Sequence, residues 1–258
     1  MTSELRESAL RLSHELGDPA HDWAILAEGN VSAAAPENTM FIKASGVSMV
    51  SAELGDYVHV SLTPILRLLD DEGADDETVG SVLMASRIDD TAKRPSVEAI
   101  LHAVCIDVAG AKFVGHTHPT DVNSLLCSSQ AQALVAGGLF PDQIVVLGQY
   151  QLLIPYTDPG LSLGRLVRER LRAFTAEHGS MPKVIYLVNH GMFALGHTAE
   201  EVSQITLMAA KSARILAGAL AIGAPVHLSA RDAERIDTRP DELLRRVALG
   251  QKGETPWS

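Results

Sequence analysis

The stretch that decides the fold occupies residues 184–202 and reads VIYLVNHGMFALGHTAEEV. It opens with the most apolar run of the chain, Val184 to Val188, which is typical of a buried β-strand. Thr198 and Glu201 have the spacing of a capping box, which predicts a long helix from there to about residue 221. A buried strand combined with a long helix favours an α/β protein.

Further strands and helices are expected on the N-terminal side of this stretch. Residues 4–16 carry apolar side chains at helical spacing, and Asp18-Pro19 ends the pattern. The order of the elements lacks the strict strand–helix–strand rhythm of a parallel sheet, so we expect a single α/β domain with a mixed or antiparallel sheet. The predicted helices cover 4–16, two segments within 63–87, a segment opening at Pro95-Ser96, about 120–127 and 161–177; the predicted strands cover 40–42, 58–60, 113–118, 144–147 and 151–154.

The composition restricts the partners of the chain. The net charge is −11 and no basic run occurs, so we expect no nucleic-acid partner. No stretch approaches the roughly 20 apolar residues of a membrane span, and the first residues lack the apolar core of a secretory signal. Cys105 and Cys127 form no disulfide framework, and both are expected to be buried packing residues. We therefore expect a cytoplasmic protein.

The C-terminal part differs in character from the rest. After residue 229 the sequence turns polar. We expect a domain at 1–228 and a tail at 229–258 that docks on a neighbouring subunit or frays. The acidic run from Asp70 to Glu77 is expected to be a solvated surface segment, and the role of the insertion at 70–93 is left open.

Three histidines are candidate metal ligands. On a strand, His116 and His118 point to the same face, so two imidazoles can bind one ion. His190 directly follows the strongest strand, and α/β folds tend to place sites at such strand ends. Three imidazoles complete the protein ligands of a catalytic zinc and leave one position open. Taken separately, the His116/His118 pair and His190 each fit ordinary buried, surface or sheet-edge histidines better than metal ligands.

Glu98 and several small turn residues are the other candidates. Glu98 lies in an otherwise apolar run near a predicted helix start, where it can complement the helix dipole or act as a general acid and base beside the metal. Backbone N–H groups and hydroxyls at turns can also hold an anion, although each such turn alone is unremarkable. The residues of this anion-binding hypothesis are Gly29, Asn30, Ser45, Gly46 and Ser96.

Taken together and in this order, these segments resemble the class II aldolase/adducin family over roughly residues 5–222. The matching stretches are AEGNVSA at 27–33, IKASGVS at 42–48, RPSVEAILHA at 94–103, GHTHPT at 115–120 and LVNHGMFALGHTAEEV at 187–202. The resemblance implies a central, mostly antiparallel sheet flanked by helices, and homotetramers with active sites between subunits.

The resemblance also assigns roles. It implies zinc, or another divalent ion such as Mn²⁺, on His116, His118 and His190, and Glu98 as acid and base. The residues Gly29, Asn30, Ser45, Gly46 and Ser96 would hold the anionic group of a sugar or sugar-phosphate-like substrate. The implied reaction is reversible retro-aldol cleavage of a hydroxylated ketose or keto acid through a metal-stabilised enediolate. Family aldolases use a tyrosine as well, but Tyr150, Tyr156 and Tyr186 are all too loosely anchored to assign.

Two departures narrow the function. Val97 stands where the family often has a second serine, so one anion contact is lost and the substrate is bound with a weakened phosphate site or lacks phosphate. The adducin-like branch lacks the three histidines, which favours an enzyme over a non-catalytic oligomeric interaction protein. The epimerase branch usually has Asp at the position of Glu98, which argues against epimerisation. A dehydratase or decarboxylase on the same metal site stays open.

Overall fold

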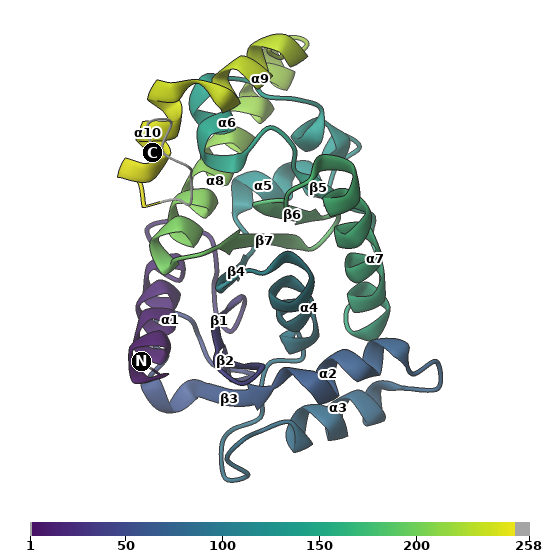
Figure 1. Ribbon diagram of the computed structural model, residues 1–258. Coiled ribbons are helices and arrows are strands. Elements are labelled where there is room, and N and C mark those ends of the chain that lie inside the picture. Colours follow the sequence, from purple (N-terminus) through teal and green to yellow (C-terminus); the bar gives the residue numbers. More distant parts are fainter. Residues whose placement is uncertain (1, 251–258) are drawn as a thin grey trace.

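A computed structural model describes residues 2–250 of the chain. Its centre is a seven-stranded sheet in the order β3-β2-β1-β4-β7-β6-β5 (Figure 1). Every neighbouring pair is antiparallel except β5 and β6, which are parallel. The expected mixed, mostly antiparallel sheet is therefore confirmed. The strands are β1 (Asn30–Ala35), β2 (Thr39–Lys43), β3 (Tyr57–Ser61), β4 (Phe113–Thr117), β5 (Leu152–Ile154), β6 (Val184–Leu187) and β7 (Gly191–Gly196).

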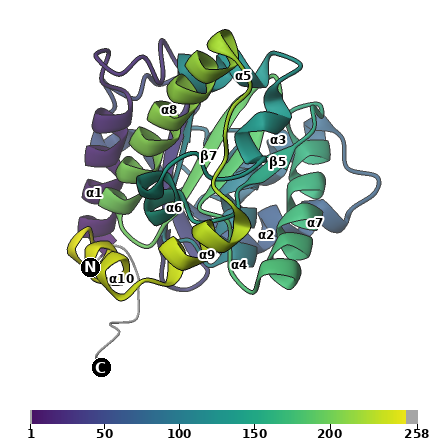
Figure 2. The same cartoon turned by 90° about the horizontal axis from the view of Figure 1, so that it is seen from above.

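Helices cover both faces of the sheet, each over its own hydrophobic core (Figures 1 and 2). One face packs against α2 (Leu62–Arg67), α3 (Asp76–Ala85), α4 (Ala99–Ala109) and α7 (Leu161–His178). The other packs against α1 (Thr2–Leu16), α5 (Thr120–Leu126), α6 (Pro141–Leu147) and α8 (Ala199–Ile222). Burial on both faces explains why the central strands read as continuous apolar runs.

The long helix α8 has the length and apolar composition of a membrane span, which the sequence reading did not recognise. In the fold its buried side chains, including Ile205 and Ala209, belong to the core shared with α1, α5 and α6. This placement is typical of the core helix of a globular domain.

One predicted element was wrong, and one predicted helix begins later than expected. Residues 144–147 form the end of α6 and not a strand, because Pro141 starts a helix whose last residues are all buried. A short apolar run of this kind does not distinguish a strand from a buried helix. Pro95 bridges to Ala44 in extended conformation, so the helix begins only at Ala99.

Cys127 is exposed, contrary to the expectation of burial, whereas Cys105 is buried.

The part of the predicted tail that the structure describes forms two helices, α9 (Ala230–Thr238) and α10 (Pro240–Ala248). Both contact α6 of the same chain. Arg246 donates hydrogen bonds to the carbonyl oxygens of Val145 (3.0 Å) and Ile144 (3.4 Å) and pairs with Asp237. Residues 251–258 of the tail lie outside the described residues, and contact with a neighbouring subunit stays a prediction.

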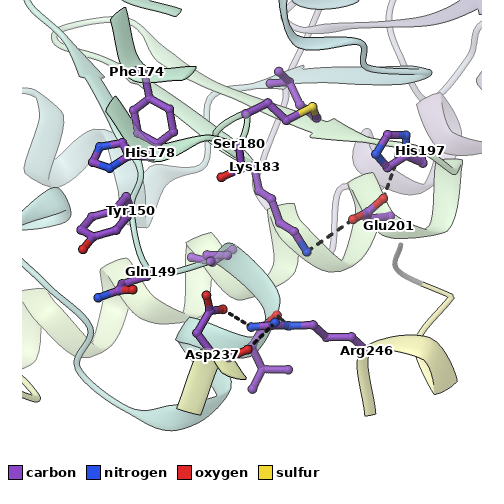
Figure 3. Close-up of a pocket in the computed structure, with 15 residues that line it drawn as sticks. Gln149, Tyr150, Phe174, His178, Ser180, Lys183, His197, Glu201, Asp237 and Arg246 are labelled. Carbon is purple, nitrogen blue, oxygen red and sulfur yellow. Dashed lines mark hydrogen bonds and ion pairs between the residues drawn. The ribbon is translucent and has the colours of Figure 1, made fainter. Parts of the chain in front are cut away.

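These contacts border a cavity of about 370 Å³ (Figure 3). Phe174, His178 and Tyr150 form one wall, with the rings of Tyr150 and His178 stacked 4.2 Å apart. Lys183 pairs with Glu201 across the cavity at 3.4 Å. Among the charged side chains that line this cavity, Arg246 joins α10 to Asp237 of α9 and to the end of α6, so its bonds hold the two C-terminal helices in place.

Replacing Arg246 with Ala is expected to loosen α9 and α10. The change leaves the Asp237 carboxylate and the carbonyl oxygens of Ile144, Val145 and Asp237 without this donor, which costs on the order of 1–3 kcal/mol. Limited proteolysis should then cleave within residues 229–248 faster than in the wild type. Arg235→Ala, at an exposed position of α9, is the matched control. Equal cleavage rates in the two variants would contradict the anchoring role.

Candidate metal centre

The candidate site lies where three central strands meet the start of α4. Asn30 at the beginning of β1 is paired with His116 near the end of β4. His190 lies in the turn between β6 and β7, and Glu98 directly precedes α4. The topology therefore brings together residues that are far apart in the sequence.

The three histidines converge. One ring nitrogen from each of His116, His118 and His190 lies within 4.8 Å of the others. The Nε2 atoms of His116 and His118 are 2.9 Å apart. Nitrogen ligands bind zinc at about 2.0–2.1 Å, so a set this tight fits a single divalent ion. Its donors are imidazoles, which suit zinc and several other transition metals.

The outer nitrogen of His116 is held by a hydrogen bond, and that of His118 faces a carboxylate. Nδ1 of His116 donates to the carbonyl oxygen of Met192 at 2.9 Å, which leaves Nε2 to face the centre. Nδ1 of His118 lies 3.8 Å from the carboxylate of Glu28. Burial, together with repulsion by His116 and His190, lowers the pKa of His118 to about 3, so its ring is neutral and available as a ligand.

Gly191 makes room for this arrangement. A Cβ added at this residue would lie 2.5 Å from Cδ2 of His118 and 2.7 Å from the carbonyl oxygen of Thr117. The backbone oxygen has little freedom to move, so the His118 ring would have to shift.

Gly191→Ala is accordingly expected to lower metal affinity by about tenfold or more, in the range seen when groups around a metal site are disturbed. Competition with a chromophoric chelator measures the affinity. The control is Gly218→Ala in α8, where an added Cβ meets no atom within 4 Å among the described residues apart from its chain neighbours and its own helix backbone. Wild-type affinity in Gly191→Ala would show that His118 is not held against this glycine.

Glu98 reaches into the centre of the histidine cluster. Its Oε1 lies 3.2 Å from Nε2 of His116 and 3.2 Å from Nε2 of His190. Its Oε2 accepts a hydrogen bond of 2.6 Å from Nδ2 of Asn30. Burial alone would raise the pKa of Glu98, but these partners outweigh it and hold the pKa well below its usual range. The same carboxylate raises the pKa of His116 despite the burial of that ring.

The predicted anion-binding residues divide into two groups. Asn30 lies 3.4 Å from Oγ of Ser96, and Ser96 also accepts from the Glu98 N–H at 3.3 Å, so both adjoin the carboxylate. Gly29 has a φ of +67°, and a Cβ there would lie 2.7 Å from the carbonyl oxygen of His116. Ser45 and Gly46 form a separate turn, which is joined to the same region by the Ser45 N–H bond to the carbonyl oxygen of Arg94.

Lys43 is a residue of this region that the sequence reading missed. It ends β2 and is almost fully buried, with its ammonium bonded to the carbonyl oxygens of Ala44 and Val47. These bonds close the turn that carries Ser45 and Gly46. Burial lowers the pKa of Lys43 to about 8, against the attraction of Glu98 and Asp56. A lysine in an otherwise apolar strand directly before a Ser-Gly turn was the available signal.

The depressed pKa of Lys43 predicts a pH dependence of stability. Between about pH 8 and 10.5 the unfolded chain retains a proton that folded Lys43 has released. The free energy of unfolding should therefore rise with pH in this window relative to Lys43→Met, by on the order of 3 kcal/mol. Urea denaturation of both proteins at pH 7.5 and 10, in the presence of chelator, measures the difference. A constant difference would contradict the assignment.

The structure separates the three candidate tyrosines from one another. Tyr186 is buried within β6, Tyr150 lines the cavity of Figure 3, and Tyr156 is exposed in the segment after β5. The histidine cluster lies at the Leu187 end of β6, whereas Lys183 of that cavity precedes the opposite end. Tyr150 is therefore placed away from the metal ligands of its own chain.

The fold and the histidine cluster define an α/β protein with a site suited to a divalent metal. A profile of the "Class II Aldolase and Adducin N-terminal domain" matches residues 9–217. The chain belongs to this family, as the resemblance predicted.

Solved structures share the fold. An "L-fuculose 1-phosphate aldolase" superposes with a TM-score of 0.68 at 17% identity, covering 92% of this chain and 96% of that one. The N-terminal class II aldolase domain of a conserved Thermoplasma acidophilum protein gives 0.66 at 21%, covering 81% and 92%. The "Uncharacterized oxidoreductase YuxG" of Bacillus subtilis (strain 168) is 24% identical over 65% of this chain, which spans 22% of that relative's length.

Proposed function

We propose that this protein is a metal-dependent aldolase that cleaves a hydroxylated ketose or keto acid reversibly. The observation that carries the proposal is the convergence of three imidazoles beside a partly buried carboxylate, with Oε1 of Glu98 3.2 Å from Nε2 of His116 and of His190. A divalent ion held by His116, His118 and His190 would act as a Lewis acid toward the substrate's oxygens. The likeness to an L-fuculose 1-phosphate aldolase is in keeping with this choice.

Glu98 is the proton carrier in the proposed reaction. It lies beside the ligand set, with Oε1 3.2 Å from Nε2 of His116 and of His190. In the cleavage direction the ionised Glu98 carboxylate would accept the proton of the reacting hydroxyl group as the carbon–carbon bond breaks and the aldehyde forms. It would then deliver that proton to the carbon that has gained the electron pair, and in the reverse direction both transfers run backwards. Asn30 donates a hydrogen bond to Oε2 of Glu98, so Oε1 stays oriented toward the three histidines.

The anionic end of the substrate would be held by Asn30, Ser96 and the backbone of the Ser45-Gly46 turn. Lys43 lies beneath this turn and adds positive charge. Val97 is 44% exposed between Ser96 and Glu98 and offers no hydrogen-bonding group. We propose that the protein offers one hydroxyl group fewer to the substrate's anionic group than the family pattern does, because Val97 replaces a serine. Both phosphorylated and unphosphorylated substrates therefore belong in the test.

The test is a retro-aldol screen with the purified protein. Ketose 1-phosphates and the matching free ketoses are incubated with enzyme loaded with Zn²⁺ or Mn²⁺ and with enzyme stripped by chelator. Formation of an aldehyde and a three-carbon ketone in the metal-loaded sample is expected. Turnover that is unaffected by stripping would refute the metal-dependent mechanism.

Product analysis separates the alternatives. A dehydratase would release water and a decarboxylase carbon dioxide from hydroxylated acids, with the carbon chain otherwise intact. A protein that binds no divalent metal and turns over no substrate would fit the non-catalytic, adducin-like alternative. The homotetramer and the cytoplasmic location remain predictions, and size-exclusion chromatography with light scattering tests the first.

A further inference from the structure

His102 is a fully buried histidine that the proposed mechanism does not use. It lies on α4, one turn after Glu98, and its ring packs against Phe193 with centroids 5.3 Å apart. Nδ1 of His102 lies 2.7 Å from Oγ of Ser32, and Nε2 contacts Oδ1 of Asn30. Ser32 and Asn30 are two residues apart on β1, so both point to the face that α4 covers.

The hydrogen-bond partners determine the direction of every donor in this chain of side chains. The carboxylate of Glu98 accepts, so the group of Asn30 that faces it must be the Nδ2 amide. Oδ1 of Asn30 therefore faces His102 and needs a donor, which places the proton of His102 on Nε2. Nδ1 is then left as an acceptor for the Ser32 hydroxyl.

All donors consequently point the same way. Ser32 donates to His102, His102 donates to Asn30, and Asn30 donates to Glu98. Hydrogen bonds in such a chain polarise one another and strengthen the last bond. Without the imidazole, the amide of Asn30 could rotate and present its oxygen to the carboxylate, which is repulsive.

We propose that His102 is a positioning residue, which fixes the amide orientation of Asn30 and through it the carboxylate of Glu98. Its role requires a neutral ring. Burial and the nearby His116 lower the pKa of His102 to about 3, so the ring stays neutral across the physiological range. His102 itself lies one side chain away from Glu98 and is not a metal ligand in this arrangement.

Two variants separate the donor from the bulk of the ring. His102→Phe keeps an aromatic ring beside Phe193 and removes both nitrogens, whereas His102→Gln retains a donor that can reach Asn30. The kinetic arm rests on the proposed function. His102→Phe should keep metal stoichiometry and lower kcat by about 10–100-fold, the scale expected for a misplaced catalytic group. His102→Gln should recover most of this loss.

A double-mutant cycle with Asn30→Ala tests whether His102 acts through Asn30. If it does, His102→Phe in the Asn30→Ala background should change kcat by less than about twofold, because the two residues form one pathway. Independent, multiplicative effects would overturn the proposal, as would failure of His102→Gln to recover activity when the variant folds and binds metal normally.

A spectroscopic arm needs no turnover and so remains decisive if the aldolase screen fails. In ¹⁵N-histidine NMR spectra, the signals missing from His102→Gln identify His102. The wild type should show the Nε2–H tautomer, and Asn30→Ala should shift its Nε2 signal. An Nδ1–H tautomer, or a His102 signal that does not respond to Asn30→Ala, would overturn the positioning role.

Discussion

Glu98→Gln is expected to bind metal with wild-type stoichiometry and to lose turnover by about 10²–10⁴-fold, the usual contribution of a general acid and base. Glutamine preserves the size of the side chain but cannot exchange a proton with the substrate. In the wild type, Nδ2 of Asn30 donates to Oε2 of Glu98 at 2.6 Å. The amide oxygen of the glutamine can accept the same hydrogen bond. Metal content by atomic emission and kcat on the best substrate of the ketose panel are the two measurements.

The control for this variant is Glu77→Gln, which removes one carboxylate from the exposed surface of α3. It should leave both metal content and kcat unchanged. Full activity in Glu98→Gln would transfer the proton-carrying role to another group. Loss of metal as well as turnover would make Glu98 a ligand in the loaded protein.

His118→Ala is expected to have the second large effect. It removes one of three ligands and leaves two, so metal affinity should fall by at least about 10²-fold and turnover should fall with it. The side chain is partly exposed at the end of β4, so its removal costs less packing than loss of the fully buried His116. Titration with Zn²⁺ and the thermal midpoint with and without metal measure the two consequences.

The matched control is His178→Ala in the cavity beside the C-terminal helices. This residue stacks on Tyr150 and borders the charged groups of Figure 3, so any general effect of losing an imidazole appears there too. Its metal content should equal that of the wild type. Unchanged metal content in His118→Ala would refute the ligand assignment.

Sequence periodicity was sufficient to predict the elements whose apolar residues follow one clear pattern. The strand at 184–188, the capping box at Thr198 and the helix at 4–16 were predicted close to their observed bounds. The strands β1 and β7 were not predicted, because glycines, small residues and turn-forming residues in and beside them weaken the alternating apolar pattern of a strand. Gly29 and Asn30 read as a turn, although Asn30 begins β1. The run 144–147 failed for the opposite reason, since burial on all sides makes a short helix look like a strand.

The candidate site was visible in the sequence as separate residues, while its connections were not. Spacing places His116 and His118 on one face, but only the antiparallel pairing of β4 with β1 sets Asn30 opposite His116. Glu98 was expected within a helical turn. It lies just before α4, with a ψ near 0°, and its side chain turns to the histidines rather than to the helix end. His102 has a role that depends on its contacts with Asn30 and Ser32 of β1, which no local pattern reveals. The Lys43 ammonium bonds to its own turn, and the place of this lysine in an apolar strand before Ser45-Gly46 was a local signal.

The order of the strands also determines when the site can form during synthesis. β4 lies between β1 and β7, so the middle of the sheet keeps one unpaired edge until residues 191–196 have left the ribosome. Pairing Asn30 with His116 closes a long loop, and His190 arrives later still. Such distant pairings slow folding and expose strand edges to association with other chains. A nascent chain that ends before β7 should therefore need protection, and uptake of metal should report that the domain is complete.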